Sequence, residues 1–407
     1  MLSITDARSS DLPDFSLFDC IVVGAGFAGS VIARELAERS GKRVAVIEQR
    51  GHIGGNAYDE LDENGVLVHR YGPHIFHTGS QRVYEYLSRY TEWYDYAHEV
   101  LADIHGAYTP VPFNLNSIEQ HFDGHKAAAL IDRLVERFGM NTKVPIIELR
   151  AQKDPLLSEL ADFVYQNVFL YYTQKQWGLA PEEVDPTVTA RVPVLVGRDN
   201  RYFQDAYQGM PRAGYTPLFE RLLDYPGIEV FVNLDAAEVL EFVAPDAGSD
   251  TPFAQTRASG AAFVGEVVYT GPLDFLCKKR FGLLPYRSLE FVYEPHDCKH
   301  VLPCGTVNYT VSEDYTRITE YTWLTGQDIS HTTLMKEYPL AFEDKPGQVP
   351  YYAILDDKNR QHYERYLGLF ASLPNFHALG RLAEYRYFNM DQIVERALEL
   401  ADSLCVG

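Results

Sequence analysis

The strongest constraint on the fold lies in residues 18–58, where two short apolar runs flank a glycine pattern and an amphipathic segment. The first run, residues 20–23, leads into the three glycines of a G-x-G-x-x-G pattern: Gly24, Gly26 and Gly29. The second run, residues 44–47, ends at Glu48. This order predicts a strand, a helix and a second strand, which together form a dinucleotide-binding βαβ unit.

The glycines have a physical role in such a unit, because they let the backbone approach a pyrophosphate at the positive end of the helix. Glu48 lies about 20 residues past the glycines and is placed to accept hydrogen bonds from a ribose diol. Gly54 and Gly55 follow, and they let a second backbone segment pack close to a cofactor. A lone glycine pattern is a weak signal, but the complete order favours a bound dinucleotide over a purely structural unit.

Composition excludes several classes of partner. The chain has 407 residues, enough for two or three domains around one ligand cleft, and its net charge is −21. This charge argues against nucleic acid or an anionic membrane as a partner. No apolar run approaches the roughly 20 residues that cross a bilayer, and the N-terminus lacks a signal-peptide pattern. The 5 cysteines show no zinc spacing. We expect a cytoplasmic protein without a bound metal.

Periodicity along the rest of the chain predicts helices and strands in separate regions. Helical spacing is found in residues 80–90, 117–138 and 155–177, and another helix is expected to start near Asp391. Strand-like runs are expected at residues 66–71, 94–115, 228–243, 263–271 and 376–382, and at several places between residues 202 and 352. Residues 1–18 are expected to form a loose tail, and residues 244–260 a surface loop.

Some side chains are candidates for a ligand site by their position. His74 and His77 come directly after the nucleotide-binding unit, on a segment expected to run beside the cofactor. Tyr172 and Trp177 offer flat faces at a helix end, where aromatic side chains either belong to the core or stack on a base or sugar.

Two arginines are candidates because of the segments that carry them. Arg191 lies in residues 179–200, a long stretch without helical periodicity that is typical of a lid. Arg381 follows an apolar strand and a glycine, and a helix begins a few residues later. That arrangement forms a second edge suited to a phosphate or flavin.

Nine short motifs, taken in order, resemble the bacterial type of the UDP-galactopyranose mutase family. They are IEQRGHIGGNAY, YGPHIFHT, YTQKQW, QGMPRAGYTP, LPYRSLEF, VNYT, TRITEY, PYYAI and GRLAEYRYFNMDQ. The resemblance covers nearly the whole chain after residue 17. It implies a flavin-dependent isomerase of galactofuranose and polysaccharide biosynthesis, which interconverts UDP-galactopyranose and UDP-galactofuranose by ring contraction. Reduced FAD would act through its N5 as the nucleophile at the anomeric carbon. We also expect a homo-oligomer.

The implied fold is α/β, with an FAD-binding Rossmann-like (GR2-type) domain, an inserted helical domain and an antiparallel β-sheet domain. The FAD-binding domain is expected in three parts, residues 18–93, 213–275 and 356–407. A mostly helical substrate domain is expected at residues 94–178, a lid and the start of the sheet domain at 179–212, and the antiparallel sheet at 276–355.

The resemblance also implies roles for individual residues. The FAD contacts would be Gly24, Gly26, Ala28, Gly29, Glu48, Gln49, Asn56, His74, Ile75, Arg381, Asn389, Met390, Asp391, Gln392 and Ile393. The substrate contacts would be Tyr172, Thr173, Trp177, Arg191, Tyr202, Arg287, Asn308, Arg317, Tyr352 and Tyr387. Tyr172 would stack on uracil, Arg191 and Arg317 would hold the diphosphate and take part in catalysis, and His77 would relay protons.

Two alternatives share the fold. One is an FAD-dependent oxidoreductase of the amine-oxidase type, which would not need the sugar-nucleotide motifs YTQKQW and TRITEY. The other is a binding module that has lost its flavin, which the intact Glu48 and glycine pair disfavour.

Overall fold

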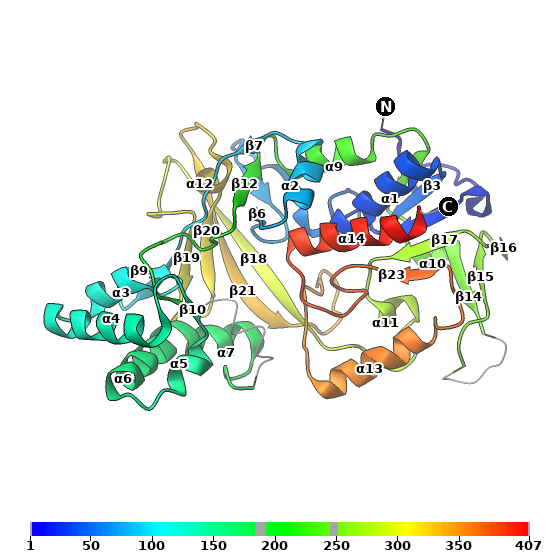
Figure 1. Ribbon diagram of the computed structural model, residues 1–407. Coiled ribbons are helices and arrows are strands. Elements are labelled where there is room, and N and C mark those ends of the chain that lie inside the picture. The colour runs from blue at the N-terminus through cyan, green and yellow to red at the C-terminus, as the bar shows by residue number, and fades with distance from the viewer. Residues whose placement is uncertain (1, 184–192, 245–250, 406–407) are drawn as a thin grey trace.

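A parallel sheet and a larger mixed sheet form the core of the computed structural model, which describes residues 2–183, 193–244 and 251–405 (Figure 1). The parallel sheet has six strands in the order β1-β13-β3-β2-β17-β23. Their bounds are Ile4–Asp6, Ile228–Val232, Val44–Glu48, Cys20–Val23, Glu266–Tyr269 and Phe376–Ala378. The sheet therefore joins segments from the start, middle and end of the chain.

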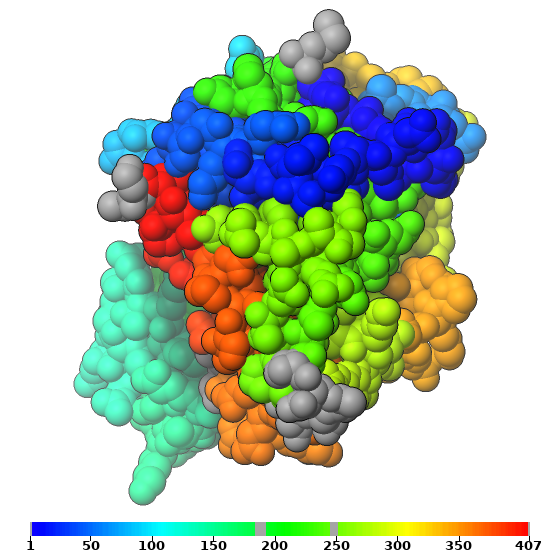
Figure 2. Space-filling view, turned by 90° about the vertical axis from the view of Figure 1, so that its right-hand side faces the viewer, coloured from blue at the N-terminus to red at the C-terminus, as the bar shows by residue number. Residues whose placement is uncertain are grey.

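The predicted βαβ unit is confirmed. Strands β2 and β3 are apolar because both faces of the sheet are covered. Helix α1 (Phe27–Ser40) lies between them in the chain and ends at Gly41, whose φ of 63° is left-handed. Helix α14 (Met390–Leu404) packs beside α1 (Figure 1), and Figure 2 shows the red C-terminal segment against the blue N-terminal one. The helix expected near Asp391 is thus present.

The N-terminal residues correct one expectation, because they are not a loose tail. Strand β1 pairs in parallel with β13, and the Ala7 N–H donates to the Val232 carbonyl at 3.0 Å. Phe15 and Phe18 are buried, and the Phe15 ring lies 5.0 Å from that of Phe231. A short edge strand needs only backbone hydrogen bonds, so its polar side chains give no warning of it.

Residues 228–262 correct two further expectations. The single strand expected at 228–243 is β13 followed by helix α10 (Ala236–Val239) and strand β14 (Leu240–Val243). Asp235 and Glu238 form a capping box that starts α10 and interrupts the extended chain. The expected loop at 244–260 contains β15 (Gln255–Ala258), which pairs with β14 and with β16 (Ala261–Ala262).

The larger sheet has seven strands in the order β22-β18-β21-β20-β19-β8-β9. Their bounds are Tyr352–Ala353, Tyr286–His296, Thr332–Ala341, Arg317–Glu320, Thr306–Tyr309, Val100–Ile104 and Ala107–Val111. Pairing is antiparallel except between β19 and β8, so the sheet is mixed rather than purely antiparallel. Two strands come from the segment expected to be mostly helical; the domain boundaries themselves remain a prediction.

A helical region with its own core lies at one end of the large sheet (Figure 1). It contains α3 (Leu115–His121), α4 (Gly124–Phe138), α5 (Ile146–Arg150), α6 (Pro155–Val164), the π-helix Tyr165–Leu170 and α7 (Tyr171–Trp177). The helix expected at 117–138 is divided, because Asp123 accepts from the Lys126 N–H and caps a new helix. The helix expected at 155–177 continues through the π-helix.

The remaining elements connect these parts. The helices are Phe15–Leu17, Gly55–Ala57, α2 (Gln81–Ser88), α9 (Tyr215–Leu223), α11 (Leu273–Leu276), α12 (Tyr321–Thr325) and α13 (Asp357–Gly368). The strands are β4 (Asp59–Leu61), β5 (Leu67–His69), β6 (Phe76–Thr78), β7 (Trp93–Tyr94), β10 (Lys143–Val144), β11 (Val194–Leu195) and β12 (Tyr207–Pro211). Across the described parts of the chain, no helix combines the length and apolar character needed to span a bilayer.

Candidate active site

Two adjoining cavities lie between the sheets. The first, of about 450 Å³, is at the carboxyl ends of β2, β3 and β17, where an open α/β sheet binds its ligand. The second, of about 230 Å³, lies between the large sheet and the helical region. Five residues line both cavities: Asn56, His74, Tyr351, Arg381 and Met390. A ligand in one cavity therefore shares a wall with a ligand in the other.

A backbone cradle forms one side of the first cavity, which we call the nucleotide cavity. The Gly54 N–H donates to the Ala25 carbonyl at 2.8 Å and brings the second glycine segment against the first. A Cβ atom on Gly55 would lie 2.9 Å from the Gly26 Cα, closer than real Cβ contacts. Only glycines allow these two segments to approach so closely, so the cradle fits a pyrophosphate that binds backbone N–H groups.

Glu48 is fixed at the edge of this cradle. It is buried, and its two carboxylate oxygens accept from the Ala25 and Arg50 N–H groups, each at 2.9 Å. A carboxylate accepts about four hydrogen bonds, so it keeps acceptor capacity toward the cavity that it lines. These carboxylate acceptors fit the ribose diol of a dinucleotide, whose hydroxyls donate.

Most of the other residues expected to contact a cofactor line one of the cavities. The nucleotide cavity also includes Ala28, Gln49 and Ile393, and the second cavity includes Ile75 and Asn389. Three expected residues line neither. Gly29 packs against the Gly24 carbonyl, Gln392 accepts from the Asn389 N–H to cap α14, and Asp391 accepts from the Thr78 hydroxyl. They shape the walls rather than face the cavity.

An arginine and a glutamate from neighbouring strands form the polar centre of the second cavity, which we call the sugar cavity. An Arg317 Nη2 donates to Glu337 Oε1 at 3.0 Å, and the Glu337 side chain is 1% exposed. Burial opposes the charge on Arg317, but the Glu337 carboxylate and nearby phenols outweigh it and hold the pKa of Arg317 above its ordinary value. The guanidinium is therefore charged at any physiological pH.

Several buried polar atoms at the sugar cavity have no hydrogen-bond partner among the described residues. They are Arg317 Nε, Asn308 Oδ1 and Gln176 Oε1. An unpaired buried polar group costs about 1–3 kcal/mol, so native proteins rarely keep several together. Their common placement in one cavity wall indicates a polar ligand that completes their hydrogen bonds.

Aromatic side chains form the rest of this wall. Tyr352 and Tyr387 stack with ring centroids 5.6 Å apart, and Arg381 lies 5.1 Å from the Tyr387 ring centroid. Trp177 lies 5.8 Å from Tyr352, and Tyr172 and Tyr202 line the same cavity. Burial raises the pKa of Tyr352 to about 12. The Tyr352 phenol is thus a neutral hydrogen-bond donor at physiological pH.

Three histidines border the cavities. His77 bonds Asp205 Oδ2 through Nδ1 at 2.8 Å, and its ring stacks on Phe203 at 3.5 Å between centroids. His74 donates from Nδ1 to the Gly72 carbonyl at 2.8 Å, and burial lowers the pKa of His74 to about 3. Burial also lowers the pKa of His98 to about 3. The last two are neutral near pH 7.

Two of the described residues expected to bind substrate do not line this wall, and a third expected residue lies outside the described parts of the chain. Thr173 is buried and does not line the sugar cavity. Arg287 bonds backbone carbonyls of α7, from Nε to Gln176 O at 2.8 Å and from Nη2 to Lys175 O at 3.1 Å. Arg191, expected on the lid, lies outside the described residues.

Among the cavity residues that the sequence did not predict are Glu337, Tyr351, His98 and Phe203. Glu337 lies opposite Arg317 in the register of β20 and β21. Only that strand pairing identifies Glu337 as the partner of Arg317, because the two residues are 20 positions apart in the chain. Tyr351 precedes the expected Tyr352, and its role in both cavities depends on how β22 joins the sheet.

Comparison with known proteins agrees with this geometry. The protein-family model for UDP-galactopyranose mutase matches residues 167–387, and one for an NAD(P)-binding Rossmann-like domain matches residues 22–90. The UDP-galactopyranose mutase of Mycoplasma pneumoniae is 33% identical over 96% of this chain and 97% of its own. The probable UDP-galactopyranose mutase of Klebsiella pneumoniae is 34% identical over 94% and 93%. The dTDP-fucopyranose mutase of Escherichia coli is 32% identical over 94% and 97%.

Solved structures of low sequence identity share the fold of this chain. A crystal structure of reduced UDP-galactopyranose mutase superposes with a TM-score of 0.65 at 16% identity, covering 95% of this chain and 93% of the other. A putrescine oxidase variant superposes with a TM-score of 0.55 at 12% identity, covering 96% of this chain and 99% of the other. At this identity the superposition shows only a shared fold. The matched family model and the full-length identity to two curated members go further: the chain belongs to the UDP-galactopyranose mutase family.

Proposed function

We propose that this protein is an FAD-dependent isomerase that interconverts UDP-galactopyranose and UDP-galactofuranose. The observation that carries the proposal is the wall shared by the two cavities, together with Arg317 and its unpaired Nε in the cavity beyond it. This arrangement holds an anionic sugar nucleotide edge to edge with a dinucleotide cofactor. Family membership supplies the reaction class.

The nucleotide cavity fits FAD on its own chemistry. Its glycine cradle suits the pyrophosphate, Glu48 suits the ribose diol, and the apolar Met390 and Ile393 suit a flavin ring. When bound in the reduced form, FAD would supply an electron-rich N5 amine as the nucleophile toward the anomeric carbon.

The protein's own part in the reaction is to bind and orient the diphosphate. A UDP-sugar brings about two negative charges into a molecule of net charge −21, so its site must be positive locally. Arg317 supplies a positive charge that Glu337 in the same wall partly offsets, and the phenols of Tyr202, Tyr352 and Tyr387 add hydrogen-bond donors around it. The same donors stabilise the charge that develops on the diphosphate when the anomeric carbon leaves it. Arg191 would add a second positive charge from the lid.

Base and sugar selection belong to the helical side of the cavity. Tyr172 and Trp177 on α7 provide flat faces for the base, and Asn308 on β19 offers an unpaired amide oxygen to a hydroxyl. His77 is held through Nδ1 by Asp205 and lines the sugar cavity, where it would relay a proton. The roles proposed for these side chains involve no net transfer of electrons.

A second sugar nucleotide is a specific alternative. The dTDP-fucopyranose mutase relative is 32% identical, close to the 33% of a UDP-galactopyranose mutase relative, so identity alone does not separate the two substrates. A direct assay does. The purified protein, reduced with dithionite, should convert UDP-galactopyranose to its furanose with greater kcat/KM than it shows on dTDP-fucopyranose.

The decisive mutation is Arg317→Ala. Removing one partner of a desolvated charge pair costs about 2–5 kcal/mol, so kcat/KM should fall about 30- to several-thousand-fold while the flavin absorption spectrum is unchanged. Arg198→Ala is the matched control, because Arg198 pairs with Glu119 at the surface, where the two side chains are 52% and 49% exposed. A protein that binds no FAD after reconstitution, or one equally active with oxidised flavin, would contradict the proposal.

A further inference from the structure

Helix α7 has attachments that the proposed chemistry does not use. It carries Tyr172, Gln176 and Trp177 into the sugar cavity, yet it is a short helix that follows a π-helix. A single turn of π-helix is less regular than α-helix and is common at functional sites. We call the flat faces of Tyr172 and Trp177 the base platform. Its geometry depends on the contacts that hold α7 in place from other elements.

Lys175 attaches α7 to β19 and to its connection with β20, the two strands that carry Asn308 and Arg317. Its Nζ donates to the carbonyls of Tyr309 at 2.6 Å, Glu313 at 2.8 Å and Tyr315 at 3.0 Å. Tyr309 is the last residue of β19, and Glu313 and Tyr315 lie in the connection between β19 and β20. An ammonium group has three donors, so these three carbonyls use all of them.

The connection is short and lies between two polar side chains that line the sugar cavity. Asn308 lies in β19 just before it, and Arg317 is the first residue of β20 just after it. Thr310 in the same connection donates from its hydroxyl to the Asn167 carbonyl at 2.5 Å, within the π-helix. A movement of this connection would displace Asn308 and Arg317 relative to the base platform.

Arg287 holds the same C-terminal end of α7 from a different strand. From β18 it donates to the carbonyls of Lys175 and Gln176 at the C-terminus of the helix, where Gly178 is left-handed. The last carbonyls of a helix lack intrahelical partners and carry the negative end of its dipole, so a cation there is stabilising. The two cations thus hold α7 against two different parts of the sheet.

Neither cation acts on a ligand directly. Lys175 and Arg287 do not line the sugar cavity, and burial lowers the pKa of each, although the nearby Glu313 and Asp314 partly offset this for Lys175. Both side chains are half-buried, so their position carries a desolvation cost that the carbonyl contacts offset. A surface charge used only for solubility would not occupy such a place.

We propose, on the basis of the function proposed above, that Lys175 and Arg287 are positioning residues that fix the base platform on α7 at a set distance from Asn308 and Arg317. Lys175 sets the platform against the β19–β20 connection, and Arg287 sets its C-terminal end against β18. They determine how tightly and how productively the sugar nucleotide binds, without touching it.

The test compares Lys175→Met with Lys153→Met, an exposed lysine of the same region. A misplacement of about 1 Å at a binding group can cost on the order of 100-fold, so Lys175→Met should lower kcat/KM for UDP-galactopyranose about 10- to 100-fold and weaken UDP binding. The flavin spectrum and the FAD affinity should be unchanged. Lys153→Met should match the wild type, and Lys175→Arg should recover part of the loss.

Coupling to Arg317 separates positioning from general stability. Because Lys175 acts through the connection that ends at Arg317, Lys175→Met should have a much smaller effect on UDP affinity in an Arg317→Ala background than in the wild type. Arg287→Met should show the same pattern and serves as the second variant if Lys175→Met does not fold. Independent, multiplicative effects would overturn the inference. Wild-type protein that does not bind UDP would instead contradict the proposed function.

Discussion

At the scale of single residues, the cofactor cradle is set by how closely two backbone segments approach. Gly55 and Gly41 both have left-handed φ values, of 57° and 63°. A Cβ on Gly55 would meet the Gly26 Cα at 2.9 Å, whereas a Cβ on Gly41 would meet nothing within 4 Å. An alanine would therefore have a similar backbone strain at both positions. Only at position 55 would its Cβ also clash with the neighbouring backbone segment.

This pair gives a matched prediction for cofactor binding. Both alanine variants should lose about 1–2 kcal/mol of unfolding free energy from the left-handed conformation. Gly55→Ala alone should also weaken FAD binding, by at least about tenfold, because the segments must move apart. Flavin fluorescence released on dilution measures this. Equal FAD affinities in the two variants would show that the close approach does not matter.

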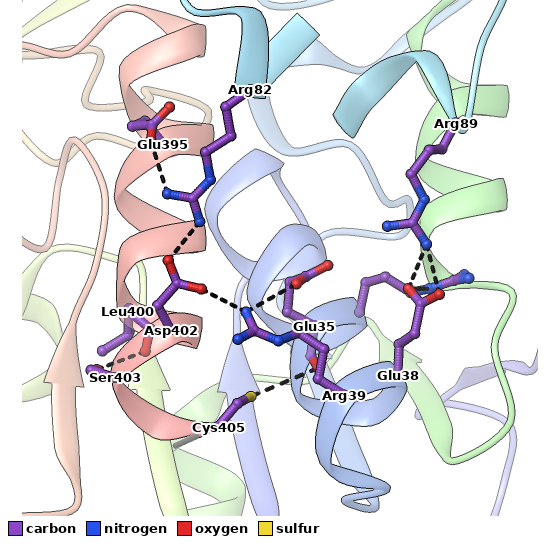
Figure 3. Close-up of polar contacts among 11 residues, drawn as sticks. Glu35, Glu38, Arg39, Arg82, Arg89, Glu395, Leu400, Asp402, Ser403 and Cys405 are labelled. Carbon is purple, nitrogen blue, oxygen red and sulfur yellow. Dashed lines mark hydrogen bonds and ion pairs between the residues drawn. The ribbon is translucent and has the colours of Figure 1, made fainter. Parts of the chain in front are cut away.

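At the scale of elements, helix α14 is joined to α1 and α2 by both charge and burial. Figure 3 shows Arg39 and Arg82 meeting at Asp402, at 2.8 and 2.7 Å. The three side chains are 37%, 44% and 49% exposed, so solvent screens the pairs. Leu398 on α14 is 3% exposed and packs in one core cluster with Val31 of α1.

Burial rather than charge should therefore attach α14. Leu398→Ala is expected to lower the free energy of unfolding by about 2–5 kcal/mol, through lost burial and a residual cavity. Arg82→Gln should cost no more than about 1 kcal/mol, and less at high salt. Urea unfolding of the two variants measures both values, and a larger loss for Arg82→Gln than for Leu398→Ala would reverse the assignment.

At the scale of the whole molecule, buried histidines link stability to pH. His69 and His98 are 1% and 4% exposed, and burial lowers the pKa of each from 6.5 to about 3. Between these two pKa values the unfolded chain binds more protons at these positions than the native protein does. The free energy of unfolding therefore falls as the pH falls through this range and is fully retained above it.

The resulting prediction concerns how steeply the free energy of unfolding changes with pH. Well below its ordinary pKa, each buried neutral histidine lowers the free energy of unfolding by about 1.4 kcal/mol per pH unit. Urea unfolding at about pH 7.5, 6.5 and 5.5 should show this decline, and His98→Asn should reduce the slope. His331→Asn is the control, because His331 is 42% exposed. A wild-type curve that stays flat down to about pH 5 would contradict it.

The sequence alone determined the features that depend on neighbouring residues. The glycine spacing and Glu48 predicted the βαβ unit, and the ordered motifs predicted the family, which the comparisons confirmed. These predictions succeeded because a tight turn, a helix and an acidic strand end are local requirements of the chain. Helical periodicity likewise located α2, α4, α6 and α14.

Only the tertiary structure decided what depends on pairing between distant segments. The N-terminal strand β1 was missed because its side chains do not alternate and its stability comes from backbone bonds to β13. Glu337 could not be assigned, because only the register of β20 and β21 brings it to Arg317. Arg287 was expected near the substrate, but the placement of β18 beside α7 directs it to backbone carbonyls instead. A residue's charge is read from the sequence, whereas its partner is set by which strands and helices pack together.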